Sequence, residues 1–164
     1  MSEAKLEVAR DTHLPIVMSW IQDREQCVQW GGPNFRYPFD AQSFVEDCRW
    51  GDLASFVLAN ASGELFAFGQ YYNRLDRCHL GRLIVSPHQR GAGYGQQLVA
   101  ELAEHGCREL GLRETSLFVL KDNPPARGLY QKLGFQFADY PEQQEWLSWC
   151  DYMVAPAGAF SATE

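Results

Sequence analysis

The sequence has no long apolar run and no closely paired cysteines. No stretch approaches the ~18 apolar residues of a membrane-spanning helix, and the opening MSEAKLEVARD holds no apolar segment typical of a signal peptide. The five cysteines are odd in number and form no CxxC pair, so we expect reduced thiols that pack in the interior. These absences predict a cytoplasmic protein without a membrane partner or a metal site.

Positive charge is scarce outside the middle of the chain. The formal net charge is -7, and no lysine or arginine occurs in residues 133–164, whereas basic residues outnumber acidic ones in residues 74–132. An acidic protein is a poor ligand for nucleic acid, so no nucleic-acid partner is expected. The basic segment suits a small polyanion and the acidic flanks suit a cationic partner, the alternative being that these charges only form a solvated surface.

The sequence also lacks repeats, low-complexity segments and linkers. Its 164 residues, 46% of them hydrophobic, therefore predict one domain over residues 1–164, with a loose tail over residues 156–164. Helices are expected from Thr12 to Ile21, from Asp40 or Ser43 to about Trp50, from the glycines near residue 95 to Gly111, and from Asn123 to Gly134. Residues 29–40 are expected to form a loop, and strands are expected at 54–59, 65–72, 78–85, 115–122, 135–140 and 149–155.

Three glycines at alternate positions follow an arginine and precede an apolar helix: Arg90, then Gly91, Gly93 and Gly95. Glycine is unfavourable inside a helix, so this spacing indicates a use for bare backbone. A Walker A loop is excluded because no lysine follows, and a dinucleotide fingerprint does not fit because the third glycine comes one place early. A loop whose N–H groups bind a pyrophosphate at a helix N-terminus remains, beside the alternative of a plain flexible turn.

Two motifs together resemble the GNAT acetyltransferase superfamily. Residues 90–95, RGAGYG, have its R-x-x-G-x-G form, and residues 123–135, NPPARGLYQKLGF, are similar to its N-x-x-A-x-x-L-Y-x-x-x-G-F stretch. The resemblance implies an α/β fold with a mostly antiparallel sheet, splayed fourth and fifth strands, and about four flanking helices. It also implies an N-acetyltransferase that moves the acetyl group of acetyl-CoA directly to a primary amine of a cationic acceptor.

The resemblance assigns the cofactor a slot between residues 83–86 and 118–121. The backbone there would meet the pantetheine arm, and the N–H of Val85 would contact the oxyanion. The cofactor-binding residues that it implies are Leu83, Ile84, Val85, Arg90, Gly91, Ala92, Gly93, Tyr94, Gly95, Gln96, Asn123, Ala126 and Tyr130.

The resemblance also makes Tyr130 the general acid that protonates the leaving thiolate. The spacing of Ala126, Leu129, Tyr130 and Leu133 alone favours a core tyrosine whose hydroxyl is satisfied. The predicted strand at residues 78–85, CHLGRLIV, corresponds to the family's fourth strand and lacks the glutamate that serves many relatives as the base. His79 is the titratable substitute there, a structural histidine being the alternative. Weaker candidates are Glu64, Asp76, Asp151 and a water chain.

The acceptor is the least determined feature. Aromatic residues near the loop could form a wall that binds an ammonium group, or could pack on the sheet; they are Trp20, Trp30, Phe35, Tyr37 and Phe39. Trp146 and Trp149 suggest a contact in a homodimer. Protein N-termini, lysine, polyamines, amino acids and aminoglycosides all remain open, as do the acyl-chain length and the alternative of a non-catalytic acyl-CoA sensor.

Overall fold

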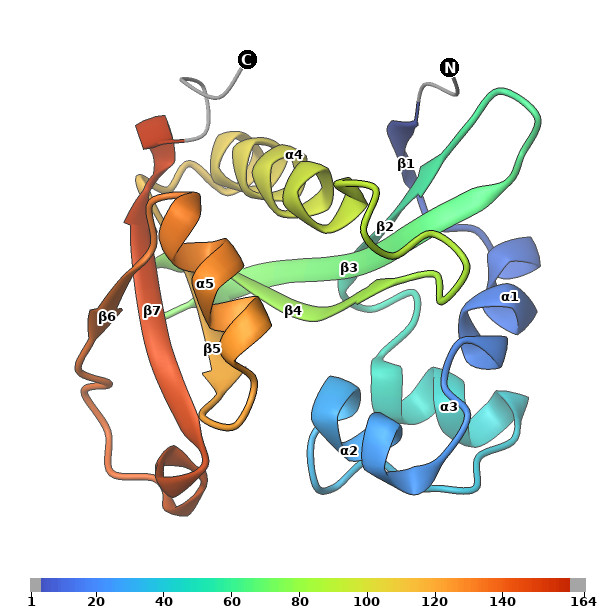
Figure 1. The fold of residues 1–164 in the computed structure, drawn as a ribbon, viewed down its shortest axis with the longest axis horizontal. Coiled ribbons are helices and arrows are strands. Elements are labelled where there is room, and N and C mark those ends of the chain that lie inside the picture. The colour runs from blue at the N-terminus through green and yellow to red at the C-terminus, as the bar shows by residue number, and fades with distance from the viewer. Residues whose placement is uncertain (1–3, 160–164) are drawn as a thin grey trace. The chain divides into compact units, whose positions relative to one another are not determined.

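A computed structural model describes residues 4–159, which form two compact units. The first unit contains residues 4–70 and 82–99, and the second contains residues 71–81 and 100–159. Seven strands form one mixed sheet in the order β1-β2-β3-β4-β5-β7-β6 (Figure 1). Strand β3 (Leu65–Arg74), strand β4 (Arg77–Val85) and helix α4 (Tyr94–Leu110) each have one part in either unit. Within residues 4–159, no helix is long and apolar enough to cross a membrane.

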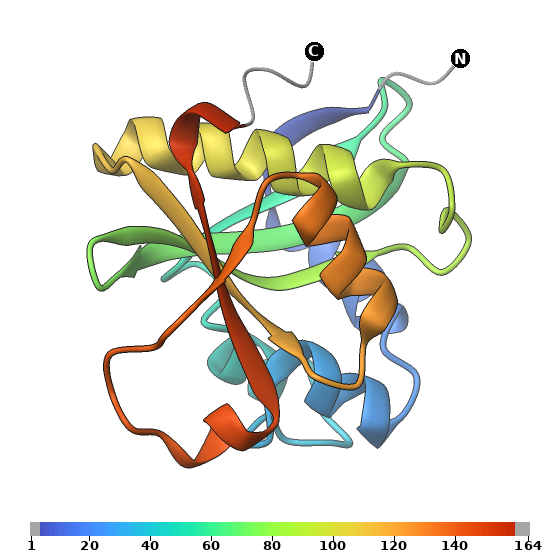
Figure 2. The same ribbon diagram turned by 60° about the vertical axis from the view of Figure 1, so that its left-hand side comes forward.

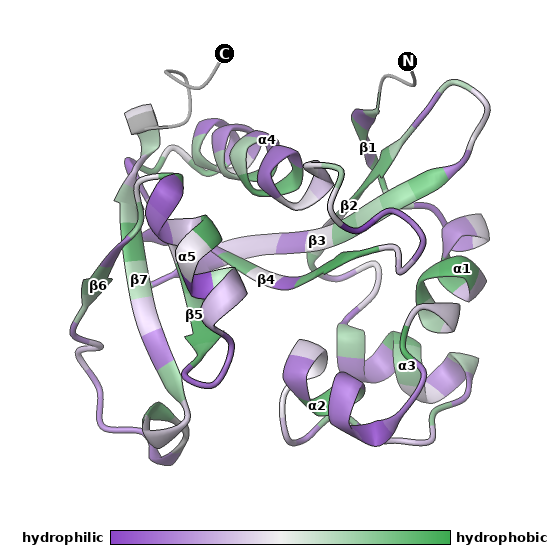
Figure 3. Ribbon diagram, in the orientation of Figure 1, coloured by the Kyte–Doolittle hydropathy of each residue, from purple (hydrophilic) through white to green (hydrophobic). Residues whose placement is uncertain are grey.

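The first unit packs side chains on both faces of β2. Because side chains alternate along a strand, Val57 and Ala59 join a cluster with the three N-terminal helices, whereas Leu58 joins a second cluster with Leu98 of α4. In Figure 3, β2 and the first part of β3 are hydrophobic, and β3 becomes polar along its length. The unit's other elements are β1 (Lys5–Val8), α1 (Leu14–Ser19), α2 (Arg24–Gly31), α3 (Ala41–Cys48) and β2 (Ala54–Ala59).

The second unit is built on β5, which pairs antiparallel with β7 along its full length, from Glu114 with Pro156 to Leu120 with Cys150. Helix α5 lies beside β7 in both views (Figures 1 and 2), and Arg127 of α5 is 3.7 Å from the Asp151 carboxylate of β7. The elements are β5 (Glu114–Leu120), α5 (Pro124–Lys132), β6 (Gln136–Ala138) and β7 (Cys150–Pro156).

Local signals in the sequence placed four helix ends correctly. The Asp40 carboxylate accepts a hydrogen bond from the Ser43 N–H at 2.8 Å and begins α3. The Asn123 side chain caps α5, with the two prolines in its first turn. Gly111 and Gly134 follow α4 and α5 with φ of 69° and 107°, a region that favours glycine at a helix end.

Other expectations were wrong at the periphery. Strand β1 and helix α2 were not predicted, and α2 includes residues 29–31 of the expected loop. Thr12 does not cap a helix, because residues 11–13 form a 3₁₀ turn and α1 begins at Leu14. Residues 156–159 are ordered, as the end of β7 and a 3₁₀ turn, whereas the rest of the expected tail lies outside the described residues.

Gly106 of α4 provides a test of packing in the second unit. An added Cβ would overlap the Cys78 sulfur and lie 2.9 Å from the Tyr71 ring, whereas at Gly128 of α5 a Cβ would meet nothing within 4 Å. We expect Gly106→Ala to destabilise the protein by about 1–3 kcal/mol through overpacking. The matched Gly128→Ala variant should instead gain about 0.5–1 kcal/mol, because alanine is the better helix former. Urea unfolding of both variants measures the two signs; equal effects would contradict this description of the α4 contact.

Candidate functional site

The glycine loop lies between the end of β4 and the start of α4, in the first unit. The loop leaves β4 at Ser86, whose N–H donates to the Phe66 carbonyl at 2.8 Å. Gly91 and Gly93 have φ of 82° and 87°, which side-chain-bearing residues rarely adopt. Helix α4 begins at Tyr94, so Gly95 lies in its first turn and not in the loop. The turn therefore requires glycine at two of the three positions.

This loop has the properties of an anion site. Gly91, Ala92 and Gly93 are exposed, and a Cβ at either glycine would meet nothing within 4 Å. The Gln97 N–H donates to the Gly93 carbonyl at 3.1 Å, so α4 begins its hydrogen bonding there. The N–H groups that precede Gln97 in the first turn have no acceptor within the helix and lie at the positive end of its dipole. A phosphate group could approach these N–H groups without displacing a side chain.

Aromatic stacking fixes the start of α4. The Tyr94 ring stacks on Phe66 of β3, with centroids 4.6 Å apart and an interplanar angle of 8°. Tyr94 also packs against the cluster that contains Leu98. The predicted contribution of Tyr94 to cofactor binding is thus left to its backbone, because its ring is engaged in the core.

Strand β4 has two different partners along its length. It pairs in parallel with β5 through Cys78 with Thr115 and His79 with Ser116, and no further pair of these two strands is found in the described residues. Towards its end, Leu83 and Val85 pack with the cluster around Phe66, and Ile84 packs with the cluster of the N-terminal helices. The last residues of β4 are thus held by the two hydrophobic clusters of the first unit.

Tyr130 lies on α5 in the second unit. Its ring packs edge-on against Phe135, with centroids 5.9 Å apart. The residue is half-buried by its exposed area, yet burial of the hydroxyl raises the pKa of the phenol to about 12. No hydrogen bond of this hydroxyl is found among residues 4–159, whereas a tyrosine used only for packing usually has a satisfied hydroxyl.

Asn123 and Ala126 are in contact at the start of α5. The Asn123 side chain accepts a hydrogen bond from the Ala126 N–H at 3.4 Å. The asparagine therefore caps helix α5. Ala126 lies one helical turn before Tyr130. Both residues help to orient the helix that carries the tyrosine.

His79 is buried in the second unit with a relative exposure of 2%. Its Nδ1 is 2.8 Å from the Ser116 hydroxyl of the neighbouring strand. Burial, and secondarily the positive charge of Arg74, lower the pKa of His79 to about 3. An imidazole in this setting is neutral and a weak base, which favours the structural alternative.

The aromatic residues before the sheet pack on one another in the first unit. Trp20 and Phe35 are each 5% exposed, and Trp30 stacks on Phe44 with centroids 5.5 Å apart. The Tyr37 ring already faces a cation of the chain, because the Arg24 guanidinium lies 5.8 Å from its centroid. These rings therefore pack mainly within the core, and they do not form an open wall for an ammonium group.

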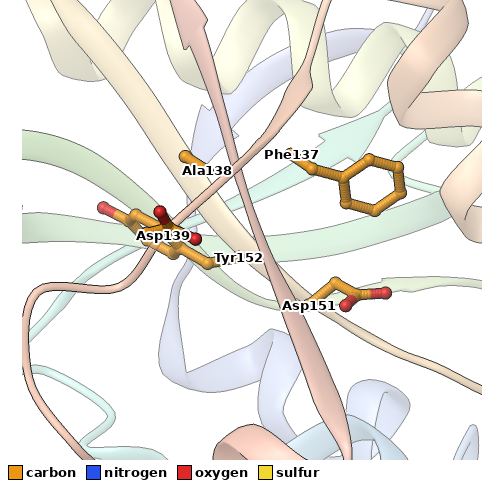
Figure 4. A pocket seen from close by; sticks show the side chains of 5 residues that line it. All are labelled: Phe137, Ala138, Asp139, Asp151 and Tyr152. Carbon is orange, nitrogen blue, oxygen red and sulfur yellow. The ribbon is translucent and has the colours of Figure 1, made fainter.

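A shallow hollow of about 370 Å³ crosses β6 and β7 in the second unit. Figure 4 shows its lining side chains: Phe137, Ala138, Asp139, Asp151 and Tyr152. Among the predicted residues it contains only Asp151, a weaker candidate for the base. Trp149 is 54% exposed nearby in sequence, whereas the side chain of Trp146 lies outside what the structure describes.

Sequence reasoning missed Arg82, which has φ of 50° in the middle of β4. Its guanidinium reaches the Gln70 amide oxygen and the Asp47 carbonyl, both at 3.1 Å. The signal was available, because an isolated glycine in a strand pattern, here Gly81, suggests a bulge.

Comparison with known proteins agrees with these features. The family described as "Acetyltransferase (GNAT) family" matches residues 24–135. A Bacillus subtilis protein named as a candidate ribosomal protein bS18-alanine N-acetyltransferase is 26% identical over 116 residues, which are 71% of this chain and 76% of the relative.

Solved structures show the same fold at low identity. Spermidine N-acetyltransferase from Vibrio cholerae, in complex with CoA and spermine, matches with a TM-score of 0.73 at 16% identity. The match covers 96% of this chain and 98% of the Vibrio cholerae chain. The ribosomal-protein-S18-alanine N-acetyltransferase from Escherichia coli has a TM-score of 0.67 at 21% identity, with 94% of each chain covered. With the family match over most of the sequence, the chain belongs to the GNAT family of N-acetyltransferases and is an acyltransferase.

Proposed function

We propose that this protein transfers the acetyl group of acetyl-CoA to a primary amine, by direct attack in a ternary complex. The observation that carries the proposal is the exposed turn at Gly91 and Gly93 directly before α4. Arg90 and the backbone from Gly91 to Gln96 would hold the pyrophosphate, with Arg90 as a charged donor. The single domain expected over residues 1–164 would be the catalytic domain.

The thioester would lie at the end of β4. The backbone of Leu83 and Ile84 would bind the pantetheine arm, and the Val85 N–H would donate to the thioester carbonyl as it becomes an oxyanion. The amine nitrogen forms a bond to the carbonyl carbon, and collapse of the intermediate breaks the carbon–sulfur bond. The amine loses a proton, and the departing thiolate takes one up.

Tyr130 would supply the proton that the thiolate takes up. A phenol with a pKa of about 12 is fully protonated at neutral pH, and transfer to a thiolate of pKa ~8.5 would be uphill by about 5 kcal/mol. Burial of the thiol in a closed site would raise the pKa of the thiol as well, because burial destabilises the thiolate, and the difference between the two pKa values would then be smaller. A half-buried phenol whose hydroxyl makes no hydrogen bond within residues 4–159 suits this donor role.

The base would be water and not His79. An amine acceptor must be neutral to attack, and His79 is too buried and too weakly basic to take its proton. Asp151 lies beside Arg127 and remains the alternative on the second unit. The Bacillus subtilis relative is named for a ribosomal-protein alanine, and a protein of the same fold is named for spermidine, so the acceptor classes to test first are protein N-terminal amines and polyamines. Of the two tryptophans expected at a contact with a second copy of the chain, Trp149 is exposed, which supports that contact.

The glycine loop can be tested with a matched pair of valine substitutions. Gly93 and Gly63 both have φ of 87° and both have open space at the Cβ position. The two variants therefore carry similar backbone strain, but only residue 93 lies in the proposed phosphate loop. We expect Gly93→Val to weaken acetyl-CoA binding at least tenfold in calorimetry, and Gly63→Val to leave it unchanged. Equal affinities would remove the phosphate site from this loop.

Tyr130→Phe should lower kcat by roughly 10–10³-fold and leave the acetyl-CoA dissociation constant nearly unchanged, because the lost proton is needed only in the transition state. Tyr71→Phe is the control, since its hydroxyl contacts His105 at 3.1 Å outside the proposed site. Steady-state CoA release with an amine panel measures both variants. A full kcat in Tyr130→Phe would return this tyrosine to a packing role.

His79→Asn separates a structural histidine from a base. The pKa of His79 is lowered in the folded protein, so its stability contribution is complete above pH ~6.5 and is lost as pH falls towards 3. In urea unfolding, the free energy of unfolding of the wild type should fall between pH 7 and pH 5, and we expect a smaller fall in the variant, because it has no imidazole to protonate. Its profile of kcat against pH should keep the wild-type shape, and a missing ionisation in that profile would restore His79 as the base.

A further inference from the structure

Arg82 combines two unfavourable features in one residue of the first unit. It has a left-handed φ of 50° inside a strand, a conformation that costs free energy for any residue with a Cβ. Its Nε is buried and has no hydrogen-bond partner among the described residues. A buried donor of a charged group is costly to leave unpaired, so stability alone does not account for this arginine. Such local conflicts are most often found at functional sites.

Three hydrogen bonds hold Arg82 in this conformation. The two terminal nitrogens of its guanidinium donate to the Gln70 side-chain oxygen and the Asp47 carbonyl, each at 3.1 Å. The Arg82 carbonyl accepts from the Trp30 indole N–H at 2.8 Å. Strand β3 and helices α3 and α2 thus each fix one atom of this residue.

The partners are themselves immobilised. Gln70 is fully buried, and its amide nitrogen donates to the Cys48 carbonyl at 2.8 Å and the Ser55 hydroxyl at 3.0 Å. Its oxygen is therefore directed to Arg82. Trp30 stacks on Phe44 of α3, which fixes the plane of the indole. The anchors are rigid enough to impose a backbone angle.

The residues that follow depend on that angle. Leu83 and Val85 pack into one cluster and Ile84 into the other, so the face that each residue presents is set directly after Arg82. Side chains alternate along a strand, and a change of register by one residue would exchange the two faces. It would also turn the backbone N–H of Val85 away from its present direction.

We infer that Arg82 is a positioning residue, whose side-chain anchors impose the kink in β4 that aims the Leu83–Val85 backbone at the thioester. This inference rests on the proposed function for its catalytic consequence, but the kink itself is a property of the protein alone. Arg82 touches no reacting atom. It acts through the direction of the strand.

Two substitutions at this position separate the inference from a purely structural role. Arg82→Met keeps the Cβ and the apolar stem but loses the guanidinium anchors, so β4 should relax towards an ordinary extended φ. Arg82→Gly also loses the anchors, yet glycine adopts a positive φ without strain and can keep the kink. We expect kcat to fall about 10²-fold in Arg82→Met, and to stay within about tenfold of wild type in Arg82→Gly. Glycine usually weakens a strand more than methionine does, so a structural role predicts the opposite order.

The measurements are kcat and KM with acetyl-CoA, and the Val85 amide resonance of the free protein. A Val85 shift that changes in Arg82→Met but not in Arg82→Gly supports the kink without reference to activity. If the wild type transfers no acetyl group, the proposed function fails while the resonance still tests the kink. Either of two results overturns the inference: a kcat of Arg82→Met within threefold of the wild type, or a kcat of Arg82→Gly that is no higher than that of Arg82→Met.

Trp30→Phe provides a second test of the inference if Arg82→Met does not fold. Phenylalanine keeps an aromatic ring over Phe44 and removes the hydrogen bond to the Arg82 carbonyl, at the cost of some packing against Phe35 and Phe68. We expect kcat to fall about tenfold with an unchanged acetyl-CoA dissociation constant. An unchanged kcat, with an unchanged Val85 resonance, contradicts the anchoring of β4.

Discussion

The course of β4 is the constraint on which the rest of the structure depends. The strand begins in parallel pairing with β5 at Cys78 and His79, and it ends where the chain must turn into the glycine loop. Between these points the pairing with β5 stops, and Arg82 adopts a left-handed φ. A strand that continued to pair would satisfy its own backbone groups. No pair of β4 with β5 beyond His79 is found in the described residues, and the proposed function assigns the thioester and the pantetheine arm to the backbone that follows, Leu83–Val85.

The central elements could be predicted because their signals are local. Asp40 and Asn123 cap helices through bonds to residues three positions away, and Gly111 adopts the backbone angle that ends a helix. Strand β1 carried no such signal, since its residues are held by pairing with β2 some fifty positions later in the chain. Helix α2 was not predicted, because the Gly- and aromatic-rich stretch at its end indicated a loop. Tertiary contacts decide these elements, and one sequence does not display them.

The candidate site divides in the same way. The Gly91 and Gly93 turn and Tyr130 follow from motifs, whereas the contact of His79 with Ser116 and the anchors of Arg82 come from residues distant in sequence. The aromatic residues before the sheet show the limit of composition. Their number suggested a binding wall, yet Trp20, Phe35 and Trp30 are core. Composition cannot distinguish a ring that faces a ligand from a ring that faces another ring.

Asp47 serves two partners at once. Its carbonyl accepts from Arg82, and its carboxylate accepts from the Arg36 side chain and backbone N–H, which belong to the segment between α2 and α3. The hydrogen bonds to Arg36 keep the pKa of this carboxyl below its usual range. The neighbouring Pro33 and Asn34 are exposed, whereas Arg36 is connected through Asp47 to Arg82 of β4. A surface loop and the interior of a strand thus share one residue of α3.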